Sequence, residues 1–104
     1  MARYSRISEK EREELLNEFC DALAVLKGPK EIKEFLVDLL TSQERVMLAK
    51  RIKVAKLLLE KKNYREIEKE LKVSHATIAK IAFWLLEGGK GFKKMAQRVK
   101  KSKN

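Results

Sequence analysis

The chain has 104 residues and a mass of 12.1 kDa, which is the size of one domain. One proline and four glycines are too few for the turns of an all-β protein, and no apolar run is long enough for a membrane-spanning helix. The single cysteine, Cys20, excludes an internal disulfide, and no signal peptide is recognised. We therefore expect a cytoplasmic, all-α protein with one domain over residues 1–100.

The positive charge is concentrated in the second half of the chain. Residues 1–49 contain 8 Lys/Arg and 10 Asp/Glu, whereas residues 50–104 contain 17 and 5, so the net charges are −2 and +12. Because each phosphate that a cation neutralises releases counterions, this asymmetry favours a nucleic-acid partner. A membrane surface is disfavoured, because the basic half lacks a long amphipathic helix with a free apolar face.

Capping signals and apolar spacing predict helices along the first half of the chain. Ser8 and Glu11 form a capping box, and the helix after them has an apolar face made of Leu15, Leu16, Phe19, Leu23 and Leu26. We expect Cys20 to be buried on this face. Gly28 and Pro29 end this helix and start a second, whose apolar residues are Ile32, Phe35, Leu36, Leu39 and Leu40.

Four more helices are predicted in the second half, which makes six in all. The capping pattern of residues 41–44 opens a third helix to about Lys61, with apolar positions Leu48, Ile52, Ala55 and Leu59. Asn63 and Ser74 cap a short fourth helix and a fifth helix that reaches about Glu87. After three glycines, a sixth helix is indicated by Phe92, Met95, Ala96 and Val99, and residues 101–104 are expected to be a disordered basic tail.

Residues 64–87 have the spacing of a helix-turn-helix. Ile67, Ile78 and Ile81 are placed to lock two short helices at a steep angle, so that the second protrudes. A helix that enters the DNA major groove needs a slim, polar first turn, and the residues there are Ser74, His75, Ala76 and Thr77, with Lys80 one turn later. Two residues depart from the usual pattern: Lys72 stands where glycine is common, and Glu68 where a small residue is common.

The sequence therefore predicts a sequence-specific regulator that binds double-stranded DNA and represses by occlusion. We expect bases to be read by the five residues just named, and phosphates to be held by Arg51, Lys53, Arg65, Lys69 and Lys72. Two alternatives remain open: a basic architectural or RNA-binding protein without sequence preference, and an adaptor for an acidic protein. An enzyme, a cofactor or a metal site is not expected, because the chain offers no nucleophile–base pair and only one His and one distant Cys.

The chain also resembles the Trp repressor superfamily, specifically its short Trp-repressor-related members. The resemblance is carried by Leu39, Leu40, Thr41, Glu44, Arg45, Leu48, Arg51, Val54, Leu58, Glu66, Ile67, Glu70, Leu71, Ala76, Thr77 and Ile78. It implies a six-helix fold in which the first three helices and the last interlock with a second subunit. It also implies an intertwined homodimer that presents two helix-turn-helix units to symmetric half-sites.

The resemblance also implies a ligand site, which this sequence matches poorly. In the family's namesake, tryptophan lies between the third helix and the recognition helix, and Thr41 and Arg51 match contributors from the third helix. On the recognition helix, Lys80 stands in place of an arginine, Ile81 in place of a glycine and Trp84 in place of a polar residue. Because large apolar side chains would fill the space of an indole, we predict that tryptophan is not a corepressor.

Overall fold

The computed structural model describes residues 6–102, and the side chains among them up to Val99. In this part of the chain there are six helices and no strand, as predicted. The internal contacts divide the chain into two compact units, residues 1–41 and 42–104, and each unit is described here by itself. The single domain predicted over residues 1–100 stays a prediction.

The first unit holds α1 (Glu9–Ala24) and α2 (Gly28–Leu39). Both bonds of the predicted capping box form: the Ser8 hydroxyl accepts from the Glu11 backbone N–H at 3.1 Å, and the Ser8 backbone N–H donates to the Glu11 carboxylate at 2.9 Å. The backbone bond, and less strongly the Ser8 side chain, hold the pKa of Glu11 below its ordinary value because they favour the charged form. The start of α1 is therefore specified by its own sequence.

None of the residues described in the first unit is buried. Along α1, Leu15, Leu16 and Phe19 are 56 %, 53 % and 41 % exposed. Cys20 is exposed too, so the expectation that it is buried fails within one chain. An amphipathic helix gains most of its stability in proteins from covering its apolar face, and this unit does not cover its own.

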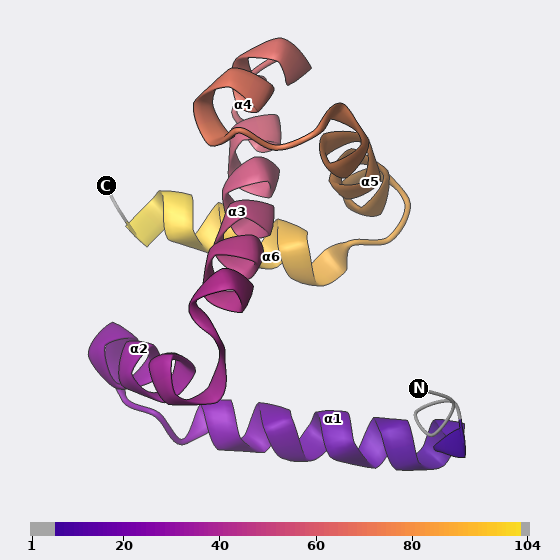
Figure 1. Cartoon of the computed structure of the whole chain (residues 1–104), viewed down its shortest axis with the longest axis vertical. Helices are drawn as coiled ribbons and strands as arrows, with labels where there is room; N and C mark the ends of the chain where they lie inside the picture. Colours follow the sequence, from indigo (N-terminus) through magenta and orange to yellow (C-terminus); the bar gives the residue numbers. More distant parts are fainter. Residues whose placement is uncertain (1–5, 103–104) are drawn as a thin grey trace. The chain divides into compact units, whose positions relative to one another are not determined.

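The second unit is built around α3 (Ser42–Leu59), which contacts α4 (Tyr64–Leu71), α5 (His75–Leu86) and α6 (Lys90–Ser102) (Figure 1). Its core consists of eight buried apolar side chains: Val54, Ala55, Leu57, Ile67, Ile78, Ile81, Leu85 and Ala96. The core gathers at the C-terminal half of α3, where α4 and α5 pack. Of the predicted positions on α3, Leu48 and Ile52 are 39 % and 41 % exposed, because no helix of this unit covers them.

Helix α6 extends beyond the boundary predicted for it. It runs to Ser102, so Lys101 and Ser102 are helical where a disordered tail was expected to begin. Residues 103 and 104 of that tail lie outside the described residues. The apolar side of α6 packs on α3, which explains why the helix persists through a strongly basic sequence.

The turn between α4 and α5 shows how the sequence manages without the usual glycine. Lys72, directly after α4, adopts φ 55° and ψ 47°, the left-handed conformation that glycine takes most readily. Its backbone N–H donates to the carbonyl of Glu68 at 2.8 Å and so closes the helix. For a residue with a side chain, this conformation costs about 1–2 kcal/mol.

We therefore expect Lys72→Gly to stabilise the protein by about 1 kcal/mol, which raises the melting temperature by roughly 4–8 °C. The matched control is Lys69→Gly, which removes the same charge from a helical position of α4 and should cost about 1 kcal/mol. Thermal unfolding followed by circular dichroism gives both values. A lower melting temperature for Lys72→Gly would contradict this account of the turn.

Candidate nucleic-acid interface

Helices α4 and α5 form a helix-turn-helix whose two starts are both capped. The side chain of Asn63 accepts from the backbone N–H of Glu66 at 2.8 Å, and the Glu66 carboxylate accepts from the backbone N–H of Asn63 at 2.9 Å. Ile67 of α4 and Ile78 of α5 are fully buried. Ile67 and Ile78 belong to one buried core with Val54 and Ala55 of α3, and this packing sets the position of α5 relative to α4 and α3.

The first turn of α5 is exposed and slim. Ser74, His75 and Ala76 are exposed, and Thr77 is half-buried. The Ser74 oxygen accepts from the Thr77 backbone N–H at 3.1 Å, and the Ser74 hydroxyl donates to Thr77 Oγ1 at 3.0 Å. The hydroxyl of Ser74 is therefore committed to the cap, whereas Thr77 keeps its own hydroxyl hydrogen for a partner outside the helix.

His75 is held in place by two residues of α4. Its Nδ1 lies 3.2 Å from Oε2 of Glu68, and its ring centroid lies 5.0 Å from that of Tyr64. A carboxylate can only accept a hydrogen bond, so the hydrogen of the neutral ring is placed on Nδ1 and Nε2 is left as an acceptor. Glu68, which stands where a small residue is common, thus contacts His75. The contact crosses the turn, and the sequence pattern did not indicate it.

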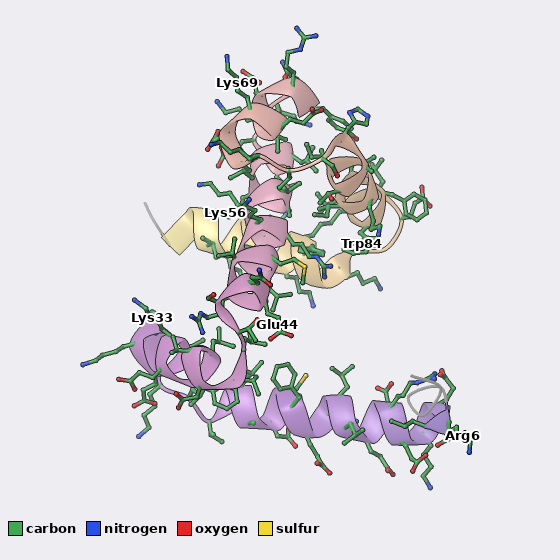
Figure 2. All side chains as sticks on the ribbon, in the orientation of Figure 1. Arg6, Lys33, Glu44, Lys56, Lys69 and Trp84 are labelled. Carbon is green, nitrogen blue, oxygen red and sulfur yellow. The ribbon has the colours of Figure 1, made fainter. Side chains whose placement is uncertain are left out.

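The predicted phosphate-binding cations lie on two helices, α3 and α4, and on the turn after α4. Arg65 and Lys69 are exposed and four residues apart on α4, and Lys72 continues the same side at the turn. Figure 2 shows Lys69 pointing away from the body of its helix. Arg51 and Lys53 are both half-buried on α3. Because they are two residues apart, they project from roughly opposite sides of this helix. Arg51 and the cations of α4 are therefore the better candidates for a single phosphate-binding surface, and Lys53 is the weaker one.

A pocket of about 200 Å³ lies between α3 and α5. It brings together three of the four predicted ligand-site residues, Arg51, Lys80 and Trp84, while Thr41 belongs to the first unit. Met47, Lys50, Val73, Thr77 and Ile81 complete the lining. Met47 and Lys50 were not among the predicted ligand-site residues. Met47 could have been found, because it stands four residues before Arg51 and so lies on the same side of α3.

Trp84 forms one wall of this pocket and also joins α5 to α6. Its ring stacks on Phe92 of α6, with centroids 5.8 Å apart and an interplanar angle of 17°. The backbone N–H of Gly89 donates to the backbone carbonyl of Trp84. A side chain at position 89 does not fit, because its Cβ would collide with that carbonyl. Trp84 is therefore part of the packing between two helices as well as a pocket residue.

Comparison with known proteins gives a consistent result. The sequence pattern of the Trp repressor protein family matches residues 14–100. The uncharacterized protein YerC of Bacillus subtilis (strain 168) is 33 % identical over 94 residues, which cover 90 % of each chain. A crystal structure of a Staphylococcus aureus protein, provisionally named a Trp repressor, matches with a TM-score of 0.80 and 33 % identity over 88 % of this chain and 92 % of that one.

Two kinds of feature are absent from the residues that the structure describes. Among them, no helix has the length and apolar character to cross a bilayer. No three His, Cys, Asp or Glu side chains within residues 6–102 lie close enough together to hold a metal ion.

Proposed function

Because the chain belongs to the Trp repressor family, whose members are DNA-binding regulators, we propose that it binds double-stranded DNA sequence-specifically and regulates transcription in the cytoplasm. The observation that carries this proposal is the exposed first turn of α5, rigidly capped and free of bulky side chains. An α-helix fits the major groove, where its first residues contact base edges. Repression then follows from occlusion of the DNA that the protein covers.

In this proposal, direct reading of bases depends on His75, Ala76, Thr77 and Lys80. Ala76 allows close approach and offers a methyl group, while Thr77 and His75 offer polar atoms to base edges. Ser74 acts mainly through the cap that orients Thr77. Arg51, Arg65, Lys69 and Lys72 hold phosphates, with Lys53 in a lesser role, and each neutralised phosphate adds about 0.9 to the slope of log affinity against log salt.

We further propose that the protein acts as a homodimer. The support is the set of apolar side chains that a single chain leaves more than a third exposed: Leu15, Leu16, Phe19, Val25, Ile32, Val37, Leu39, Val46, Met47, Leu48, Ile52, Phe83 and Leu86. Exposed apolar surface of this extent is typical of an interface, and a symmetric dimer buries each residue twice. Two subunits also present two copies of α5, which suits DNA with two-fold symmetry.

Tryptophan is not expected to act as a corepressor. The pocket of about 200 Å³ is walled by the indole of Trp84 itself, and Lys80 offers a point charge in place of the flat guanidinium of arginine. Calorimetric titration with L-tryptophan should therefore give no saturable heat up to millimolar ligand, and DNA affinity should not change when tryptophan is added. Saturable binding in the micromolar range would overturn this prediction.

The contact between Glu68 and His75 leads to a prediction about base preference. With Nδ1 tied to the carboxylate, Nε2 of the neutral ring accepts, which favours the amino groups of adenine or cytosine. A glutamine amide can donate to Nδ1 as well as accept from it, so Glu68→Gln should weaken that preference and admit guanine at one position per half-site. Sequencing of DNA selected by each variant measures the change.

The matched control for this experiment is Glu70→Gln, which alters the charge of the same helix by the same amount at an exposed position. It should leave base preference as in the natural protein, and His75→Ala should relax the same position that Glu68→Gln relaxes. If neither variant changes the selected sequence, His75 does not read a base.

The experiment that tests the proposed function is selection of randomised duplex DNA by the purified protein at about 150 mM salt, where non-specific binding is weak. Enrichment of a two-fold symmetric sequence supports a sequence-specific regulator. Retention of DNA without any enriched sequence would favour an architectural protein instead. Absence of retention would contradict DNA binding altogether.

A further inference from the structure

Helix α6 has one exposed face on which every charged side chain is cationic, with the neutral Gln97 among them. Residues 88–104 contain seven Lys/Arg and no Asp or Glu. Lys90, Lys94 and Arg98 follow one another at intervals of four, Lys93 flanks them, and all four are exposed. The opposite side is apolar: Ala96 is buried, and Phe92, Met95 and Val99 are half-buried. The basic residues are thus separated cleanly from the side that packs.

This arrangement lowers the stability of the helix. Lys90 and Lys93 stand in the first turn of α6, where the helix dipole is positive and disfavours cations. The pairs Lys90–Lys94 and Lys94–Arg98 place like charges four residues apart, which is also destabilising. By contrast, each of α1 to α4 carries an acidic residue in its first turn. A face that served only for solubility would gain from interspersed Glu or Asp, as on α1.

We propose that this α6 face binds the phosphates of double-stranded DNA outside the base pairs that α5 reads; the inference rests on the proposed function. From Lys90 to Arg98 the cations span about 12 Å of helix axis, a length over which duplex DNA presents several charges. This face belongs to the same compact unit as α4 and α5, so α6 and the base-contacting helix α5 would reach the DNA together. The phosphate contacts of α6 would lengthen the stretch of DNA that the protein binds, without adding base pairs to the sequence that it recognises.

The acidic helix α1 of a second subunit is a weaker partner for this face than DNA. Glu9 of α1 pairs with Arg12 at 2.6 Å, and Glu11 is engaged in the capping box. Lys10 and Arg12 interrupt the negative charge at the start of this helix, and four carboxylates, Glu13, Glu14, Glu18 and Asp21, are spread over the rest of it. A DNA backbone carries a regular, uninterrupted row of negative charges.

The test replaces Lys90, Lys93, Lys94 and Arg98 by Gln in one protein and compares it with a control in which Lys10, Lys27, Lys30 and Lys33 are replaced by Gln. Both proteins lose four positive charges from exposed positions. Affinity for the selected sequence is measured against salt, in a minimal duplex of about 20 base pairs and in one of about 40. Circular dichroism and sedimentation give the melting temperature and the dimer dissociation constant.

The α6 variant should lower the salt slope on the long duplex by about 2–4 units and abolish the gain in affinity that the longer duplex gives the natural protein. Its melting temperature should be equal or higher, because like-charge repulsion is removed. The control should change the slope by less than one unit. The selected sequence should be the same for all three proteins, since α6 reads no bases.

An unchanged slope and length dependence in the α6 variant would overturn the inference. So would weaker dimerisation with an unchanged slope, because the face would then bind the partner subunit. These outcomes are distinct from failure of the proposed function, in which the natural protein enriches no sequence. Even in that case the slope and length dependence can be measured on random duplex DNA.

Discussion

Replacing Leu16 by Glu should abolish dimer formation at micromolar concentration and lower DNA affinity at least 100-fold. Leu16 is 53 % exposed on α1 in the single chain, where a charged side chain would cost little. In a symmetric dimer the substitution acts twice. Each copy loses about 1.5–3 kcal/mol of apolar burial and also faces burial of a charge, so the dissociation constant should rise by a factor of about 1,000 or more.

The matched control is Asn17→Glu, which introduces the same charge one residue further along α1 at an exposed polar position. It should dimerise as the natural protein does. Sedimentation equilibrium gives the mass of each variant, and a melting temperature that rises with protein concentration would indicate that folding and association are linked. A Leu16→Glu protein that dimerises and binds DNA normally would contradict the assembly proposed above.

Replacing Ala76 by Leu should lower affinity for the selected DNA about 30- to 100-fold without loss of stability. Ala76 is exposed in the first turn of α5, so three added carbons meet no neighbour within the chain, and leucine is a good helix former. On DNA, the same carbons would occupy the space in which α5 approaches the base edges. The expected loss of about 2–3 kcal/mol is that of disrupted base contacts.

Ala76→Ser provides the control, because it keeps the residue small at the same place. It should retain most of the affinity and change base preference at most. Fluorescence anisotropy on the selected duplex and thermal unfolding of the free protein give the two quantities separately. If Ala76→Leu binds as tightly as the natural protein, α5 does not enter the groove through its first turn.

Local signals predicted the secondary structure well because three of the helix starts, those of α1, α4 and α5, are encoded in a few capping residues. The capping boxes at Ser8 and Asn63 and the cap at Ser74 form as expected. Lys72 replaces the usual glycine yet still takes the left-handed conformation, so the turn geometry follows from packing rather than from residue type. Such packing, through Ile67 and Ile78, was predictable from their spacing.

Burial was harder to predict, because it depends on which surfaces meet. Helix α3 has apolar residues on several sides, and spacing alone could not show that Val54 and Leu57 are buried while Leu48 and Ile52 are exposed. The same limit applies to Cys20, whose apolar neighbours suggested burial that one chain does not provide. In the candidate site, the contact of His75 with Glu68 crosses the turn and depends on how α4 and α5 are angled.

The central claim is that a dimer reads two half-sites through two copies of α5, and a spacing series tests it most directly. Two selected half-sites are placed with centres about one helical turn apart, and the separation is then increased in single base-pair steps. We predict maximal affinity near one turn and a loss of at least 30-fold after about five added base pairs, which move the half-sites to opposite faces of the duplex. Equal affinity at every spacing would contradict the claim, because each α5 would then bind independently of the other.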